Sequence, residues 1–194
     1  MPGLINSGWD LTGFGSMAVT VDVGAAVGGG RFTLDIKDQN RNARKLAYWG
    51  ASLGVGVGVH GSSDALLTAA ERAAQAGFRF VLNIILPMLR MAANSQDLPS
   101  RQSRIFLKEG FSTPAPLSWN GDFLNKSLLM ITVGAGLGFG LSGTLILFFP
   151  SRVTWGQFAP IEAIENARAI AFSGGMQMGQ VGADIVGTPC MHVG

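Results

Sequence analysis

The stretch "GVGVGV", residues 54–59, decides how this chain is interpreted, because glycine and valine alternate in it without interruption. Successive side chains of a β-strand lie on opposite faces of the sheet, so this alternation predicts one bare face and one apolar face. A bare face lets a second backbone approach closely or lets the sheet curve sharply. The stretch therefore favours a strand of a small, strongly curved sheet.

A second stretch repeats the pattern. Residues 54–62 read "GVGVGVHGS" and residues 136–144 read "GLGFGLSGT". Both contain three glycine–apolar pairs, one further residue, a glycine, and then Ser or Thr. The glycines in and beside these stretches are our candidate membrane-insertion or pore residues: Gly50, Gly54, Gly56, Gly58, Gly134, Gly136, Gly138 and Gly140.

The same residues also fit membrane helices. Small residues four positions apart allow helices to pack closely in lipid, and Gly50, Gly54 and Gly58 have this spacing. The uncharged span 127–151 exceeds the roughly 20 apolar residues that a helix needs to cross a bilayer. Each glycine in a water-exposed helix costs about 1 kcal/mol relative to alanine. We therefore prefer strands, with glycine-zipper transmembrane helices as the alternative.

Other segments predict a mixture of strands and helices. Residues 15–40 predict a hairpin, with "MAVTVDV" and "RFTLDIK" as strands and the glycines 28–30 as the turn. The stretch "SSDALLTAAERAAQA", residues 62–76, predicts a long helix, "APIEAIENARAIA", residues 159–171, a short one, and "RIFLKEGF" a short strand. The expected class is α+β: a glycine-rich antiparallel sheet or small barrel with one long and one short helix.

The composition limits the classes of partner. A chain of 194 residues suits a single domain, 1–194, and the polar stretch 94–104 is typical of an internal linker. Only 13% of the residues are charged, so the apolar faces must be buried, meet lipid or meet a partner. A net charge of +2 does not indicate a nucleic-acid partner. The N-terminal stretch lacks the pattern of a secretory signal peptide, so we expect export by another route.

Few residues suggest chemistry. His60, Cys190 and His192 are the only His and Cys of the chain, and "CMH" has the composition of a metal ligand pair. Two ligands close to a terminus do not make a metal site, and a nucleophilic Cys190 would need an orienting group and an oxyanion hole that no motif indicates. We therefore expect no enzyme activity, no cofactor and no metal.

The remaining charged residues fit solvated surfaces. Glu162 and Glu165 lie three apart and read as a solvated helix face with Arg168 nearby, rather than as paired catalytic acids. Arg101 and Arg104 read as part of the linker, although they could also touch lipid headgroups or nucleic acid. No lysine follows the glycine-rich stretches in the way that a phosphate-binding loop requires.

The repeats "GASLGVGVG" and "GAGLGFG", in a small and moderately apolar chain, resemble the glycine-rich pore-forming effectors of bacterial type VI secretion. The resemblance covers residues 47–61 and 130–144. It implies an antibacterial pore-forming toxin that a secretion-tube protein carries out of the producing cell. Such a toxin inserts into the inner membrane of the target cell as a homo-oligomer, dissipates ion gradients, and is neutralised by a cognate immunity protein.

Two functions follow as hypotheses. In the toxin, residues 47–61 and 130–149 line or span the pore, and charges at its mouths, such as Asp22, Asp64 or Asp122, set ion selectivity. The alternative is a soluble glycine-rich β-barrel binding module without membrane activity.

Overall fold

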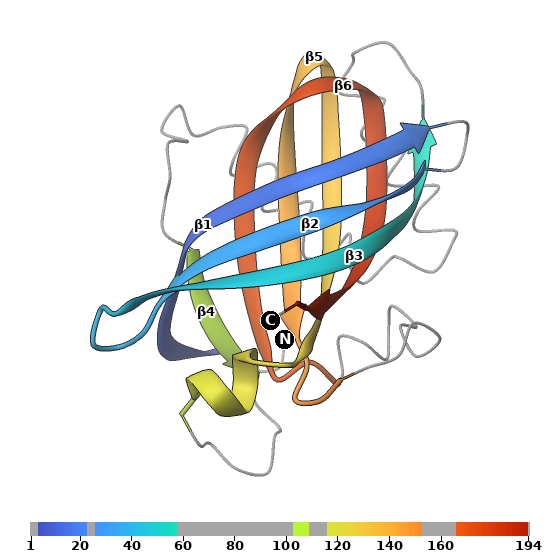
Figure 1. Cartoon of the computed structure of the whole chain (residues 1–194). Helices are drawn as coiled ribbons and strands as arrows, with labels where there is room; N and C mark the ends of the chain where they lie inside the picture. Colours follow the sequence, from blue (N-terminus) through green and yellow to red (C-terminus); the bar gives the residue numbers. More distant parts are fainter. Residues whose placement is uncertain (1–3, 23–25, 58–102, 109–115, 153–165, 194) are drawn as a thin grey trace.

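Strands dominate the described part of this protein. The computed structural model describes residues 4–22, 26–57, 103–108, 116–152 and 166–193. Its elements are β1 (Leu4–Asp22), β2 (Ala26–Lys37), β3 (Ala43–Val57), β4 (Ser103–Lys108), the π-helical turn η2 (Trp119–Phe123), β5 (Ser127–Phe148) and β6 (Ala169–His192). Figure 1 shows the first three strands crossing in front of β5 and β6.

The strands form a closed antiparallel barrel. Their order is β3-β2-β1-β4-β6-β5, and an additional pairing of β3 with β6 joins the two sides of the sheet. In Figure 1, β5 and β6 are each bent in the middle, so each supplies two arms, and the barrel has eight strands in all. Closure leaves few free strand edges, which otherwise promote aggregation.

The bend of β5 lies at one glycine. The ladder between β5 and β6 runs from Ser127 opposite Met191 to Phe148 opposite Ala169, with a single register shift that contains Gly138. The hydroxyl oxygens of Thr132 and Thr144 lie 3.0 Å apart, so the two arms of β5, residues 127–137 and 139–148, lie beside each other. At this shift Gly138 of β5 faces two residues of β6, 179 and 180, so the extra residue of the bulge belongs to β6, and a bulge of this kind bends the paired strands.

The expectation of an α+β fold is wrong, because the described chain is nearly all strand with almost no helix. Ala169, Ile170 and Ala171, expected at the end of the short helix, pair instead with residues 105–107 of β4. The long helix expected over 62–76 lies outside the described residues, as does 159–165. The alternative of transmembrane helices is also wrong for residues 127–148, which form β5. Where the chain is described, no helix has the length and hydropathy needed to cross a bilayer.

The hairpin expected over residues 15–40 is present, but its turn is elsewhere. β1 and β2 pair from Asp10 opposite Lys37 to Asp22 opposite Ala26. The glycines 28–30 are therefore strand residues, paired with residues 18–20 of β1, rather than the turn. The short strand expected from Arg104 is β4, which begins at Ser103, so the last two residues of the expected linker 94–104 are strand.

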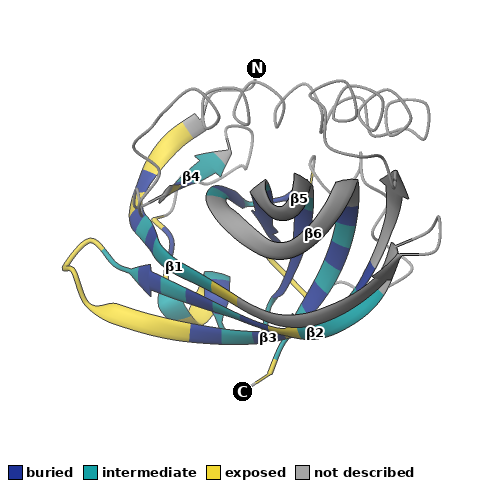
Figure 2. Cartoon of the chain, turned by 90° about the horizontal axis from the view of Figure 1, so that it is seen from above, coloured by how far each residue is buried: buried dark blue, intermediate teal, exposed yellow. Residues whose placement is uncertain are grey.

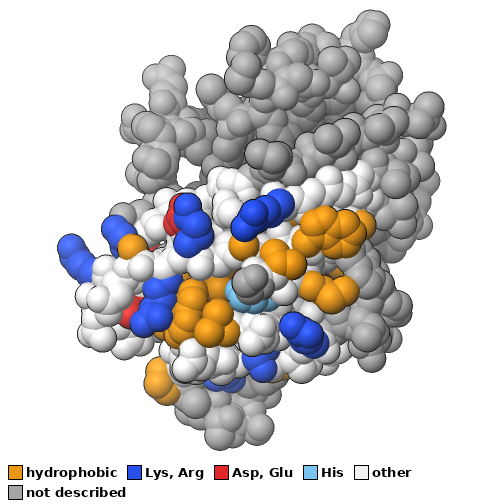
Figure 3. Space-filling model, in the orientation of Figure 1, with side chains coloured by type: hydrophobic (Ala, Val, Ile, Leu, Met, Phe, Trp, Pro, Cys, Tyr) orange, Lys and Arg blue, Asp and Glu red, His pale blue; other side chains and the backbone are white. Residues whose placement is uncertain are grey.

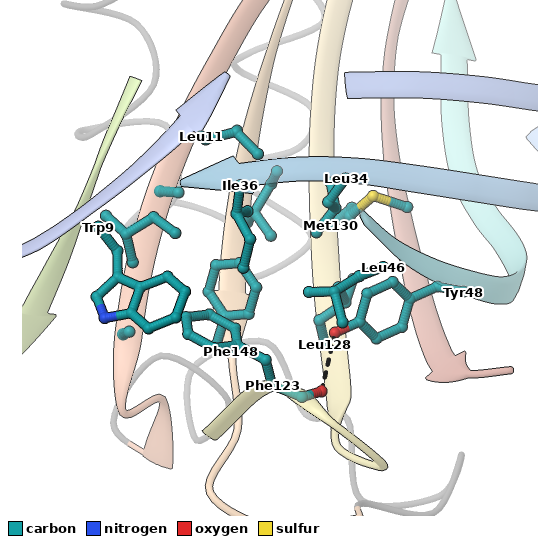
Figure 4. Close-up of a cluster of buried hydrophobic side chains, with 14 of the residues drawn as sticks. Trp9, Leu11, Leu34, Ile36, Leu46, Tyr48, Phe123, Leu128, Met130 and Phe148 are labelled. Atoms are coloured by element: carbon teal, nitrogen blue, oxygen red, sulfur yellow. Dashed lines mark hydrogen bonds between the residues drawn. The ribbon is translucent and has the colours of Figure 1, made fainter. Parts of the chain in front are cut away.

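Large apolar side chains fill one end of the barrel (Figure 4). The ring centroid of Phe123 lies 4.8 Å from that of Trp9 and 5.4 Å from that of Phe148. The Tyr48 hydroxyl donates a hydrogen bond of 3.4 Å to the Phe123 carbonyl, and the Trp9 indole N–H donates one of 3.1 Å to the Leu117 carbonyl. The turn η2 therefore seals this end, which we call the closed end.

Both faces of β5 are buried over residues 127–131 and 144–148. Leu128, Met130, Ile146 and Phe148 belong to the core. On the opposite face, Leu129 is 4% exposed and Ile131 1%, and the same face of the returning arm is equally buried. Figure 2 shows the described part of this hairpin in dark blue. The outer face of β5 is thus shielded within a single chain.

Candidate membrane-insertion site

The backbone register brings the glycines of β3 and β5 to the two sides of one arm of β6. Gly56 of β3 pairs with Asp184, and Asp184 pairs on its other side with Gly134 of β5. Gly54 pairs with Val186 in the same way. Three strands that are distant in sequence thus meet at one level of the barrel.

The remaining candidate glycines lie along the same region. Gly136 pairs with Gly182, and Gly140 pairs with Gln177. Gly138 lies at the register shift of β5, and Gly58 lies outside the described residues. We call this region the glycine-rich end; it comprises residues 16–22, 26–30, 50–57, 132–144 and 173–188.

Alternation along β3 assigns its residues to the two faces of the barrel. Leu46 and Tyr48 belong to the core, so the inner face continues through Gly50, Ser52 and the positions of Gly54 and Gly56. The inner face of β3 therefore changes from large apolar residues at the closed end to small residues at the glycine-rich end.

Buried hydroxyl groups lie where the core gives way to the glycines. Ser52 is 6% exposed and Thr188 4%, and their side-chain oxygens lie 2.8 Å apart across β3 and β6. Thr132 and Thr144 form the second pair, across the arms of β5. The two hydroxyl groups of each pair form a hydrogen bond with each other, as polar groups in an apolar interior require. The two hydroxyl pairs thus mark the level at which the apolar core ends.

Gly50 shows how closely β3 packs against β6. A Cβ atom at this position would lie 2.9 Å from the Pro189 carbonyl oxygen and 2.9 Å from Cγ2 of Thr188, and would also meet the Cys190 sulfur. Backbone cannot move aside as a flexible side chain can. The absence of a side chain at Gly50 is therefore required by the closure of the barrel.

We expect Gly50→Ala to lower the free energy of unfolding by about 1–3 kcal/mol, because the methyl group forces β3 away from β6. Urea unfolding followed by tryptophan fluorescence would measure the loss. Ala43→Val is the matched control, since it adds volume at an exposed position of the same strand and should change stability by no more than about 0.5 kcal/mol. Equal stability of Gly50→Ala and wild type would contradict the close packing.

Beyond Trp49, the outer positions whose side chains are described are small or apolar: Ala51 on β3, Leu129 and Ile131 on β5, and Gly187 and Pro189 on β6. The backbone register continues these rows through positions where the sequence has no charged residue. These positions are 53, 55 and 57 on β3, 133, 135 and 137 on β5, and 181, 183 and 185 on β6. An apolar outer face around a small or polar inner face is the pattern of barrels that lie in membranes.

A row of residues separates this apolar face from the charged part of the barrel. Arg31 of β2 pairs with Trp49 of β3, and Trp49 pairs with Met191 of β6. Trp49 is 51% exposed, and Arg31 is exposed as well. Further from the glycine-rich end, Lys45 and Asp35 form an exposed ion pair of 3.6 Å. The outer face is therefore divided into an apolar zone and a charged zone.

The cysteine and histidine near the C-terminal end of β6 do not form a reactive pair. Burial raises the pKa of the Cys190 thiol, which keeps it protonated, and its sulfur donates to the Thr188 carbonyl at 3.4 Å. The pKa of His192 is lowered, first by its desolvation and then by Arg152, and its ring lies edge-on to Tyr48 at 5.5 Å. The described part of the chain holds no cluster of metal-ligating side chains, and His60 lies outside it.

Of the charged residues that the sequence analysis singled out, the structure describes Asp22, Arg104, Asp122 and Arg168. Asp122 lies at the closed end, where it forms an ion pair with Arg168 and accepts a hydrogen bond of 2.7 Å from the Ser118 N–H. Arg104 lies in β4 opposite Asp10. Glu162, Glu165, Asp64 and Arg101 lie outside the described residues. Asp22 pairs with Ala26 at the glycine-rich end.

Sequence reasoning missed the hydroxyl pairs and the row around Trp49. The hydroxyl pairs join residues as far as 136 apart, so no local pattern indicates them. A signal for the row was present: in "RKLAYWGASLGVGV" the charges stop four residues before Trp49, and only small and apolar residues follow it. No family model, curated protein or solved structure matches this chain, so its function is argued from the barrel itself.

Proposed function

We propose that this protein is a pore-forming toxin that inserts the glycine-rich end of its barrel into a target membrane. One observation carries the proposal: the described outer positions beyond Trp49 are small or apolar, whereas the described inner face gives way from large core residues to Gly50 and two pairs of hydroxyl groups. A barrel that stays in water needs the opposite distribution, with apolar residues inside and polar residues outside. The closed end of the same barrel has that distribution.

The length of the apolar zone suits a bilayer. On β5 this zone covers the positions from Leu129 to Leu137, and on β6 those from Val181 to Pro189. A tilted transmembrane strand needs about 9–11 residues, so each of these arms is close to the required length. The charged zone below Trp49 would then remain at the membrane surface.

The described form is a closed one. The aromatic cluster of Trp9, Tyr48, Phe123 and Phe148 blocks the barrel below the hydroxyl pairs, so this form has no continuous passage. The outer face of β5 is also shielded within the chain. We infer that insertion uncovers this face, and that conduction requires either displacement of the aromatic cluster or a passage between the copies of a homo-oligomer.

The resemblance to type VI effectors adds partners to the proposal. A secretion-tube protein would carry the closed form, the inner membrane of a target cell would receive it, and a cognate immunity protein would protect the producer. No nucleic acid, cofactor or metal has a part in this function.

A soluble binding module is the second candidate. The buried outer face of β5 favours it, because a chain that shields its own apolar face is suited to remain a monomer in water. The two candidates differ in their behaviour toward lipid.

Current across a planar lipid bilayer is the test. The purified chain, added to one side in an asymmetric KCl gradient, should produce discrete steps with a nonzero reversal potential. We expect a preference for cations, because the charged residues in the sequence of the glycine-rich end, Asp22 and Asp184, are both acidic. A silent bilayer, from protein shown to be folded and monodisperse, would contradict the toxin and support the binding module.

A further inference from the structure

Basic residues and a tryptophan lie along the boundary between the apolar and charged zones. A continuous row of register positions crosses it: Arg31 on β2, Trp49 on β3, Met191 on β6 and Ser127 on β5. Lys126 precedes the last of these, and its ammonium group donates to the Pro150 carbonyl at 2.7 Å. Arg152 donates to the Asn125 carbonyl at 3.3 Å beside it. We call Arg31, Trp49, Lys126 and Arg152 the rim.

The rim is positively charged, and none of its three basic residues forms an ion pair with a carboxylate of the described residues. The ion pairs among the described residues join Lys45 to Asp35 and Arg168 to Asp122, so no carboxylate neutralises Arg31, Lys126 or Arg152 there. The charge of Arg152 also reaches His192, where it contributes to the lowered pKa of the imidazole. Figure 3 shows basic and hydrophobic side chains interleaved around the pale blue histidine of this face, with few acidic ones.

We propose that the rim is a binding surface for the headgroups of anionic phospholipids, and that it sets the depth at which the barrel inserts. This proposal rests on the proposed membrane function and names the lipid that the same surface prefers. Tryptophan favours the boundary between hydrocarbon and headgroups, and basic residues are attracted to anionic lipid at the same depth. The apolar zone directly beyond the rim favours a bilayer over a nucleic acid, which would leave that zone exposed to water.

Vesicle flotation tests the proposal with the full chain. The probes are vesicles of phosphatidylcholine alone and vesicles of phosphatidylcholine with phosphatidylglycerol in equal parts. Wild type should bind the anionic vesicles more tightly, and each of the changes Arg31→Gln and Arg152→Gln should weaken that binding about five-fold without changing binding to the neutral vesicles. Trp49→Ala should weaken binding to both kinds.

Lys45→Gln is the matched control, because Lys45 is an exposed base that already has an acidic partner away from the rim. It should bind both kinds of vesicle as wild type does. Circular dichroism would verify that every variant is folded, which is expected because Arg31, Trp49 and Arg152 are exposed.

The outcomes separate this proposal from the function on which it rests. Equal binding of wild type to both vesicles, or unchanged binding of the variant that combines both arginine changes, would overturn the headgroup surface while leaving insertion intact. Absence of binding to either vesicle would overturn insertion as well. Tight binding to duplex DNA with none to vesicles would assign the rim to nucleic acid instead.

Discussion

Replacing Gly56 by leucine should abolish the current steps in a planar bilayer. Gly56 lies on the inner face of β3, opposite Asp184 of β6, which pairs in turn with Gly134. The interior of an eight-stranded barrel is only wide enough for side chains to fill, so one branched side chain among these glycines should block it. The measurement is single-channel current at equal amounts of folded protein.

Val55→Leu is the matched control for this experiment, since it introduces a larger apolar residue one position away on the outer face. An apolar addition that faces lipid should leave the current unchanged. If Gly56→Leu conducts as well as wild type, the passage does not run through this barrel. If both variants are silent, the loss does not come from blocking the inner face.

Replacing Phe123 by alanine should cause the largest loss of stability, about 3–5 kcal/mol. The Phe123 side chain is fully buried, and its ring contacts those of Trp9 and Phe148 at the closed end. Its removal leaves a cavity that the rigid barrel can fill only in part. The measurement is the free energy of unfolding in urea, from wild type and variant under the same conditions.

Trp49→Ala provides the comparison, because it removes a larger ring from a position that is 51% exposed. We expect a change of no more than about 0.5 kcal/mol from this variant. A similar loss from both variants would mean that the aromatic cluster is not the core of the barrel. A stable Trp49→Ala variant also shows that any loss of vesicle binding comes from the surface and not from unfolding.

Alternation in the sequence predicted part of the fold well. The hairpin of β1 and β2 follows from period two, and the described part of β2 shows its cause: Phe32, Leu34 and Ile36 are buried in the core, whereas the residues between them are not. The span 127–151 lacks this alternation between a buried and an exposed face, so its sequence fitted both a strand and a membrane helix. Leu128 and Leu129 are both buried, so the run is apolar on both faces and resembles a membrane helix in composition.

Pairing between strands that are distant in the sequence determines the features of the fold that could not be predicted. Ala169, Ile170 and Ala171 are good helix formers by sequence, but β4 holds them in a ladder that no local pattern indicates. The triplet of glycines 28–30 resembles a turn, yet its partners in β1 keep it extended. The candidate glycines were identified from their repeat, whereas their meeting around Asp184 depends on the register of three strands.

The pairing of β3 with β6 has a consequence for biogenesis. Ser52 and Thr188 are partners across this closure although 136 residues separate them in the chain. While the chain is being synthesised, the sheet of β1, β2 and β3 therefore keeps an open edge at β3 until β6 has left the ribosome. Such long-range pairing folds slowly, and an open apolar edge recruits other chains in the meantime. A chaperone that covers the β3 edge is therefore expected to raise the yield of folded chain.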